Sequence, residues 1–326
     1  MQAKLRNPIQ FQGDLNQTDY FEGWYYKQVS ADQKTSLSFI PGISLNAKDA
    51  HSFIQYILVQ SSDTGKTSTL TGYVRFPLES FDYQDTPFAV RIGDSMFTER
   101  MIDIDLVDGN VHFKGQLQLG KLQPIETSFF EPNIMGIFAY TPKMECYHGV
   151  ISMNHRLEGS LMINAQSVHF TNGKGYLEKD WGTSFPKRYI WLQSNHFDNP
   201  ATSLFFSIAH IPFHFTEFEG FICNVVHEGK EYRFATYNLS RCRLEEVTAE
   251  RVRLRLENRS ARLDILAEVA QAAELIAPVQ GTMQKTIKEG ISGILTIRLE
   301  NKKTGEIYEG MGHNAGVEIV DYELGQ

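Results

Sequence analysis

The stretch Met101-Ile-Asp-Ile-Asp-Leu-Val-Asp-Gly-Asn-Val-His-Phe-Lys-Gly115 decides the fold. Apolar and polar residues alternate along it on both sides of the turn dipeptide Asp108-Gly109. Period-two alternation is typical of a strand with one buried face, and two such runs joined by a turn are typical of a hairpin. The stretch therefore predicts two neighbouring antiparallel strands.

Short runs of the same kind recur throughout the first half, separated by turn residues. They are Tyr20–Val29, Ser36–Ile40, Ser52–Val59, Gly72–Phe76, Phe88–Ile92 and Gln116–Leu119. Consecutive strands joined by tight turns form a meander, and a meander tends to close into a barrel because closure removes exposed sheet edges. We therefore expect an all-β fold of antiparallel barrels.

The two halves of the chain resemble each other. A shift of 167 or 168 residues superposes Trp24 on Trp191, Thr35–Phe39 on Thr202–Phe206 and Ser52–Leu58 on Gly220–Val226. Gly173-Lys-Gly175 also resembles Gly310-Met-Gly312, each opening a final strand. Matches in the same order along both halves predict two similar barrel domains, residues 1–185 and 186–326.

The first domain carries an extra length near residues 124–161. Its first part contains Pro124, Pro132 and Pro142 and predicts a loop, whereas Met144–His155 alternates and predicts one or two strands. Long insertions on a barrel commonly close or line its mouth.

One segment of the second half has the composition of a helix. Residues 243–275 are rich in Glu, Arg, Leu and Ala, but Val252–Glu257 and Ala261–Ile265 alternate with period two. The alternation favours strands there, with a short helix only around residues 268–275.

Composition limits the possible partners. The chain has 31 Lys and Arg against 39 Asp and Glu, without a basic block, which disfavours nucleic acid and anionic membrane surfaces. Cys146, Cys223 and Cys242 form neither a disulfide framework nor a zinc pattern, which suits a reducing compartment. The N-terminus lacks a signal-peptide core, and the uncharged run Asn199–Thr216 is broken by proline and histidine. We expect a cytoplasmic protein without a transmembrane segment.

The stretch Gly175-Tyr-Leu-Glu-Lys-Asp-Trp-Gly-Thr-Ser-Phe-Pro186 places two carboxylates, Glu178 and Asp180, beside Trp181. Burial among rings disfavours the charged form of an acid, which can then donate a proton near neutral pH. Alternation puts Glu178 and Asp180 on one side of a strand and Trp181 on the other. The alternative is a domain junction with solvated acids, and the sequence leaves open which side faces inward.

A second group, Glu145, Cys146, Tyr147 and His148, occupies the extra length. His148 is either a proton carrier at a cavity mouth or an ordinary core or surface histidine.

Metal and nucleotide cofactors are not expected. His210 and His214 have a spacing that suits a helix face, but Pro212 lies between them, and on a strand they would be about 13 Å apart. The Gly-x-Gly pairs at Gly173 and Gly310 do not open a helix as a dinucleotide fingerprint does.

Two motifs carry a family resemblance. Phe21-Glu-Gly-Trp-Tyr-Tyr-Lys27 and Glu178-Lys-Asp-Trp-Gly-Thr-Ser-Phe-Pro186, followed by Trp191-Leu-Gln-Ser-Asn195, resemble the tocopherol cyclase family. The resemblance runs from Tyr20 to about Glu318. It implies two lipocalin-like domains, related to carotenoid hydratases, and a cofactor-free reaction in which a prenyl double bond is protonated and a phenol oxygen closes a chromanol ring. The plant enzymes carry a transit peptide, and they differ from this chain around Glu145–His155.

From these observations we expect cyclisation or hydration of an isoprenoid or prenylated aromatic substrate, a hydrophobic small molecule. Asp180 is the expected general acid, and Glu178 or His148 the proton relay. The expected substrate-binding residues are Trp24, Tyr26, Glu22, Glu145, Trp181 and Trp191. The alternative is a carrier or sensor that binds such a lipid without changing it.

Overall fold

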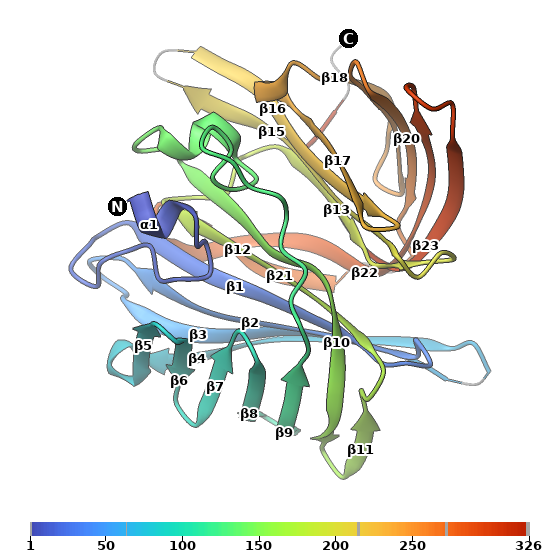
Figure 1. Ribbon diagram of the computed structural model, residues 1–326. Coiled ribbons are helices and arrows are strands. Elements are labelled where there is room, and N and C mark those ends of the chain that lie inside the picture. The colour runs from blue at the N-terminus through green and yellow to red at the C-terminus, as the bar shows by residue number, and fades with distance from the viewer. Residues whose placement is uncertain (1, 63, 214–215, 271–272, 324–326) are drawn as a thin grey trace. The chain divides into compact units, whose positions relative to one another are not determined.

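The computed structural model describes residues 2–62, 64–213, 216–270 and 273–323, and almost all regular structure in them is β (Figure 1). The exceptions are one short α-helix, α1 (Gln2–Leu5), and three 3₁₀ turns, η1 (Leu78–Ser80), η2 (Gly136–Tyr140) and η3 (Thr236–Asn238). All printed strand pairs are antiparallel, so the predicted fold class is confirmed. No helix in the described part of the chain is long and apolar enough to cross a membrane.

Within these residues, twelve strands form one sheet and eleven form another. The first sheet contains β1 (Tyr20–Val29), β2 (Thr35–Leu45), β3 (His51–Ser61), β4 (Thr67–Pro77), β5 (Phe81–Asp85), β6 (Phe88–Ile92), β7 (Ser95–Thr98), β8 (Met101–Asp108), β9 (Val111–Leu119), β10 (Cys146–Ile163), β11 (Gln166–His169) and β12 (Lys174–Gly182). The second contains β13 (Tyr189–Ser194), β14 (His196–Phe197), β15 (Thr202–Phe213), β16 (Thr216–His227), β17 (Lys230–Ala235), β18 (Arg241–Val247), β19 (Arg251–Glu257), β20 (Ala261–Glu268), β21 (Ala273–Val279), β22 (Thr282–Asn301) and β23 (Ile307–Val320).

The hairpin predicted for Met101–Gly115 is present. β8 and β9 pair from Met101 with Gln118 to Asp108 with Val111. The strands expected in residues 243–275 are also found, as β19 and β20. The short helix allowed near residues 268–275 is wrong for the described residues, because Glu268 ends β20 and Ala273 begins β21; residues 271–272 lie outside them.

The chain divides into two compact units. Unit 1 comprises Met1–Thr127, Glu145–Phe185 and Glu274–Ile287, and unit 2 comprises Ser128–Met144, Pro186–Ala273 and Lys288–Gln326. The segment Glu274–Ile287 joins unit 1 through its contacts there. Gln55 Oε1 accepts a hydrogen bond from the Ile276 amide at 2.8 Å, and Ser44 Oγ donates to the Gly281 carbonyl at 2.5 Å. The assignment of 1–185 and 186–326 to separate domains stays a prediction.

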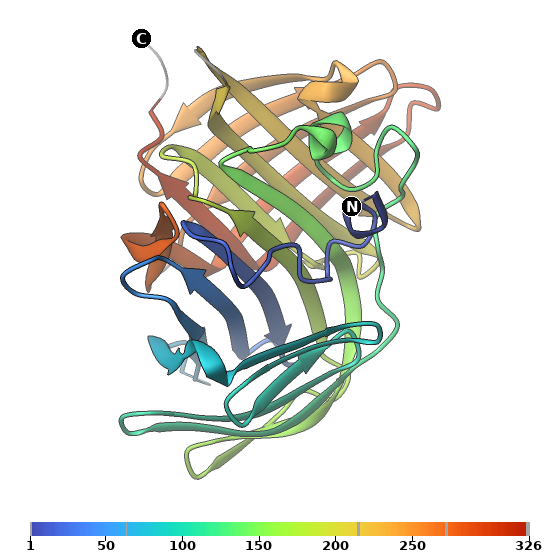
Figure 2. The same cartoon turned by 90° about the vertical axis from the view of Figure 1, so that its left-hand side faces the viewer.

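The two sheets have corresponding strand orders, β4-β3-β2-β1-β12-β10 in one and β17-β16-β15-β13-β23-β22 in the other. In each, the first long strand lies beside the last, as the turned view also shows (Figure 2). This order agrees with an internal repeat. One of the sheets curls into a nearly closed barrel.

The register corrects one detail of the sequence repeat. Tyr26 lies opposite Phe39 in unit 1, and Leu192 lies opposite Phe206 in unit 2, so the first strands correspond with a shift of 166 residues. The superposition of Trp24 on Trp191 is therefore one residue out. A slip of one residue along a strand moves a side chain to the other face.

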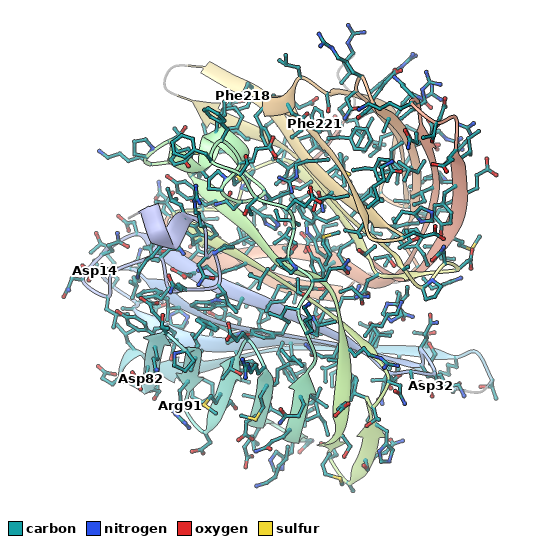
Figure 3. All side chains as sticks on the ribbon, in the orientation of Figure 1. Asp14, Asp32, Asp82, Arg91, Phe218 and Phe221 are labelled. Carbon is teal, nitrogen blue, oxygen red and sulfur yellow. The ribbon has the colours of Figure 1, made fainter. Side chains whose placement is uncertain are left out.

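Each unit has its own apolar core. The core of unit 1 includes Trp24, Tyr26 and Leu177, and the core of unit 2 includes Leu192 and Phe221. Polar side chains take the outward positions: Asp82 and Arg91, opposite each other on β5 and β6, are both exposed (Figure 3).

Candidate proton-transfer site

Strand β12 presents two different faces. Leu177 and Trp181 belong to the core of unit 1, and Lys179 shares their side of the strand. Because side chains alternate along a strand, Tyr176, Glu178 and Asp180 lie on the opposite face. Glu178 and Asp180 thus share one side of the strand, and Trp181 lies on the other.

His148 lies between these two carboxyl groups. It is the register partner of Asp180 on the neighbouring strand β10. Its Nδ1 is 2.8 Å from Asp180 Oδ1, and its Nε2 is 3.3 Å from Glu178 Oε2. The imidazole therefore has an acidic oxygen at each ring nitrogen. We call these three residues the acid–histidine triplet.

The triplet favours a protonated imidazole. Burial is the largest single influence on His148 and opposes protonation, but the charges and hydrogen bonds of Asp180 and Glu178 together outweigh it and raise the pKa of His148 to about 10. The side chains of His148 and Glu178 are 11% and 5% exposed, whereas that of Asp180 is 24% exposed. Asp180 is therefore the member most open to a second molecule.

Two further residues touch the triplet. The Tyr176 hydroxyl donates a 2.5 Å hydrogen bond to Glu178 Oε2, and the phenol is fully buried. Burial, followed by the charge of Glu178, raises the pKa of Tyr176 well above its usual value. Cys146 Sγ is 3.8 Å from Asp180 Oδ1, and burial raises the pKa of this thiol. Contacts thus run from a buried phenol through Glu178 and His148 to the more exposed Asp180.

The three residues of the triplet are also close enough to bind one metal ion, because one ligand atom from each lies within 4.8 Å of the others. A metal-bound histidine gives one ring nitrogen to the ion and its other N–H to a carboxylate or carbonyl. Here both nitrogens face carboxylates, so a single ion could bind to one side of the ring only. The donor set suits a bound proton better than a metal ion. At the histidine pair considered from the sequence, His210 Nε2 is 3.6 Å from Glu219 Oε2, and His214 lies outside the described residues.

The other face of β12 contains a second charged group, which is fully buried. Lys179 Nζ is 2.5 Å from Glu22 Oε1, and both side chains have no exposed surface. Tyr20 and the amides of Gln12 and Gly13 donate hydrogen bonds to the Glu22 carboxylate. Burial lowers the pKa of Lys179 to about 8, although the charge of Glu22 opposes this shift.

This second group fastens the N-terminal arm to the core. Lys179 Nζ donates to the Gln10 carbonyl at 2.5 Å, and Trp24 Nε1 donates to the Ile9 carbonyl at 2.7 Å. The ammonium group also lies 4.9 Å from the ring centroids of Trp24 and Trp181, within the range of a cation–π interaction. We call Glu22, Lys179 and their partners the closed ion pair.

The expected site residues therefore fall into separate places. Asp180, Glu178 and His148 come together. Glu22, Trp24, Tyr26 and Trp181 lie on the core side, where the Tyr26 hydroxyl donates to the Thr98 carbonyl at 3.0 Å. Glu145 directly precedes β10, three residues before His148, and its carbonyl accepts hydrogen bonds from Thr183 and Ser184. Trp191 lies on β13 of unit 2, opposite Glu318. Their roles in binding substrate stay predictions.

Sequence reasoning missed Tyr176 and Lys179. Alternation could have placed Tyr176 with Glu178 and Asp180, because all three have even numbers on one strand. Lys179 lies between Glu178 and Asp180 in the sequence, but neighbours along a strand point in opposite directions, so it faces away from both. Its partner Glu22 comes from β1, where Trp24 pairs with Lys179 in register.

The sequence profile of the tocopherol cyclase-like family matches residues 128–320, more than half of the chain and the part that contains the triplet. A search of curated protein sequences finds no significant match.

Solved structures with similar folds include kievitone hydratase from Nectria haematococca, with 12% identity and a TM-score of 0.53 over 92% of this chain and 88% of that one. CghA in complex with Sch210972 has 9% identity and a TM-score of 0.54 over 92% and 88%. A protein of Nitrosomonas europaea assigned provisionally as AttH has 13% identity and a TM-score of 0.53 over 91% and 92%. At these identities the likeness concerns the fold.

Proposed function

Because the chain belongs to the tocopherol cyclase-like family, we propose that it catalyses acid-assisted addition of an oxygen nucleophile to a carbon–carbon double bond. The proposed substrate is an isoprenoid or a prenylated aromatic molecule, and the reaction is ring closure or hydration. The observation that carries the proposal is the position of His148 between the carboxyl groups of Glu178 and Asp180, with Asp180 as the most exposed of the three; this position raises the pKa of His148.

Addition to an alkene needs one group that first gives a proton and then takes one back. The hydrogen bond between His148 Nδ1 and Asp180 Oδ1 allows a proton to pass from the imidazolium to the carboxylate. Asp180 then presents that proton outward. Glu178, which receives the Tyr176 hydrogen bond, keeps the ring oriented and stabilises its charged form.

The proposed step conserves atoms and charge. The proton from Asp180 adds to the less substituted alkene carbon, and the electron pair of the double bond forms the new C–H bond. The tertiary cation that results accepts an oxygen lone pair from a phenol of the same molecule, or from water. The oxygen then loses its proton to Asp180, which returns it to His148. No oxidant, reductant or cofactor is consumed.

A single substitution tests this proposal. Asp180→Asn keeps the shape of the side chain but removes its ability to carry the proton, so turnover of a prenylated hydroquinone should fall by about 10²-fold or more. Ligand-induced stabilisation against heat should remain, because binding to the folded state does not need the proton. The matched control is Asp264→Asn, which removes a carboxylate from a surface pair with Arg255 and should leave turnover unchanged.

The alternatives give different results. Normal turnover in Asp180→Asn would end the assignment, and loss of turnover only in Glu178→Gln would move the role to Glu178. A wild-type protein that binds prenylated hydroquinones and carotenoids without converting them would instead be a carrier.

A further inference from the structure

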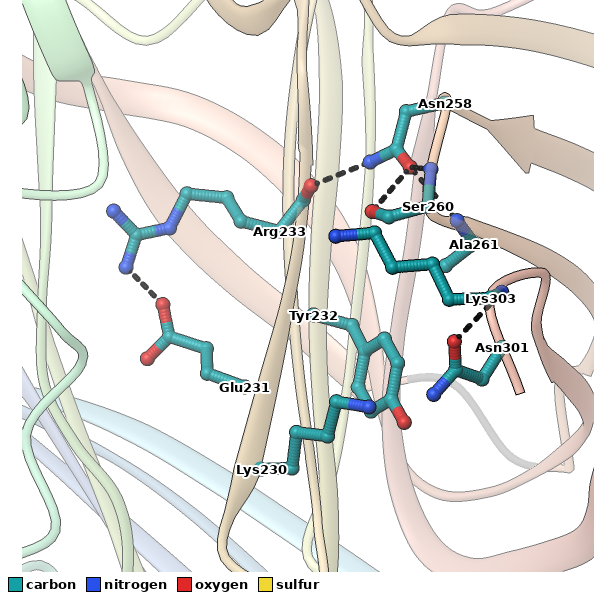
Figure 4. A pocket seen from close by; sticks show the side chains of 9 residues that line it. All are labelled: Lys230, Glu231, Tyr232, Arg233, Asn258, Ser260, Ala261, Asn301 and Lys303. Carbon is teal, nitrogen blue, oxygen red and sulfur yellow. Dashed lines mark hydrogen bonds and ion pairs between the residues drawn. The ribbon is translucent and has the colours of Figure 1, made fainter. Parts of the chain in front are cut away.

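Unit 2 contains a polar pocket that the proposed reaction does not use. It has a volume of about 220 Å³ (Figure 4). Three parts of the chain line it, namely β17, the turn between β19 and β20, and the turn between β22 and β23. The lining residues are Lys230, Glu231, Tyr232, Arg233, Asn258, Ser260, Ala261, Asn301 and Lys303.

Two lysines give the pocket its charge. The side chains of Lys230 and Lys303 both extend toward the middle of the group (Figure 4). Lys230 Nζ lies 4.8 Å from the ring centroid of Tyr232. Among the described residues, no ion pair with a carboxylate involves either lysine. Two exposed ammonium groups therefore line the pocket without an acidic partner among the described residues.

The acid that lines the pocket is already neutralised. Glu231 pairs with Arg233, which also holds Glu131 at 2.9 Å. The side chains of Glu231 and Arg233 lie on one side of β17, and those of Lys230 and Tyr232 lie on the other (Figure 4). Burial lowers the pKa of Arg233 most strongly, but the charges of Glu231, Tyr237 and Glu131 outweigh it and raise the pKa overall. This arginine therefore stays charged and keeps the Glu231 carboxylate engaged.

The rest of the lining is held in place by hydrogen bonds and offers hydrogen-bond donors. Asn258 Oδ1 accepts bonds from the Ser260 and Ala261 amides, and its Nδ2 donates to the Arg233 carbonyl at 3.1 Å, so the turn is tied to β17. Asn301 is 4% exposed, and its Oδ1 accepts the Lys303 amide at 3.1 Å. In the described part of the chain, its Nδ2 has no protein acceptor. The amide of Asn301 thus adds a hydrogen-bond donor to the two ammonium groups.

We infer that this pocket binds a small polar molecule with a phosphate or carboxylate group. Lys230 and Lys303 bind the oxyanion by charge-assisted hydrogen bonds. Asn301 and Ser260 contact the hydroxylated remainder of the ligand. A water molecule occupies about 30 Å³ in the liquid, so the pocket, with about 220 Å³, has room for more than a single oxyanion.

Calorimetric titration of the full chain with ribose 5-phosphate, gluconate and uncharged ribose tests the inference. Ribose 5-phosphate, gluconate or both should bind, and ribose should bind at least about tenfold more weakly. Lys303→Met should raise the Kd of the bound anion by about tenfold or more. The control variant Lys48→Met, an exposed lysine of unit 1, should not change it.

The inference is overturned if neither anion binds at 10 mM, as an order-of-magnitude limit. It is also overturned if ribose binds as tightly as its phosphate, or if Lys303→Met binds like the wild type. Circular dichroism of the variants excludes unfolding as the cause of lost binding. Turnover at Asp180 is a separate readout, so failure here leaves the proposed reaction untouched.

Discussion

The two faces of β12 use similar charged groups for different purposes. On the core face, Lys179 and Glu22 are completely buried, and they also bond to backbone groups of residues 10–13 and to the Tyr20 hydroxyl. On the opposite face, His148 is held between Glu178 and Asp180, and Asp180 keeps a quarter of its surface. A buried ion pair without access to solvent can fix structure but cannot meet a substrate. The comparison teaches that access, more than charge, separates the triplet from the closed ion pair.

The largest effect is expected on the closed face. Lys179→Met leaves Glu22 buried without its cation, and breaking a buried pair in this way costs about 3–5 kcal/mol. Urea unfolding should show this loss, and turnover per folded molecule should change little. The control Lys114→Met removes an exposed partner of Asp105, and water screens that pair, so the free energy of unfolding should change far less. A loss below about 1 kcal/mol in Lys179→Met would contradict the distinction between the two faces.

On the open face, the expected effect is a dependence of stability on pH. The pKa of His148 is about 10 in the folded chain, above the value of about 6.5 for an unfolded histidine. Its contribution is therefore complete below pH 6.5 and is lost as pH rises toward 10, by up to about 1.4 kcal/mol per pH unit. Lys179 contributes with the opposite sign between about pH 8 and its ordinary value of about 10.4: its folded pKa is lowered, so stability rises with pH across that window.

The comparison with His148→Gln isolates this contribution. The difference in unfolding free energy between wild type and variant should shrink steadily from pH 6.5 to 10. A constant difference across this window would show that the two carboxylates do not hold a proton on His148. His155, on the same strand, should behave in the opposite way. Burial lowers its pKa to about 3, below the value of about 6.5 in the unfolded chain, so His155 reduces stability as pH falls below 6.5.

The smallest effect is expected from Tyr176→Phe. The variant keeps the buried ring and loses one hydrogen bond to Glu178, so it should cost about 1 kcal/mol. Turnover should fall by less than about tenfold, because the hydroxyl bonds to Glu178, and Tyr176 lies four residues before Asp180. A fall as large as that of Asp180→Asn would instead make Tyr176 a proton donor in the reaction. Steady-state kinetics of the two variants decides between these outcomes.

The sequence predicted the strands and part of the site for local reasons. Alternation along Met101–Gly115 reports burial directly, and the same periodicity places Glu178 and Asp180 together on β12. Pairing across strands is not local. The position of His148 opposite Asp180 depends on the register of β10 with β12, and the link between Lys179 and Glu22 depends on that of β12 with β1.

The tryptophans expected to bind substrate illustrate the same limit. Trp24 and Trp181 look like a substrate cage in the sequence because aromatic residues cluster near acids. In the structure both rings contact Lys179 and help to close the core. The register also shows that Trp24 and Trp191 do not occupy equivalent positions in the two units, because a shift of one residue moves a side chain to the other face of the strand.

The central claim is that Glu178 and Asp180 hold a proton on His148, and nitrogen NMR of the histidine side chains tests it most directly. Assignment comes from the signal lost in His148→Gln. The account predicts that both ring nitrogens of His148 stay protonated at pH 8 and that the imidazolium titrates near pH 10. Titration of His148 near the ordinary histidine value of about 6.5 would contradict this claim.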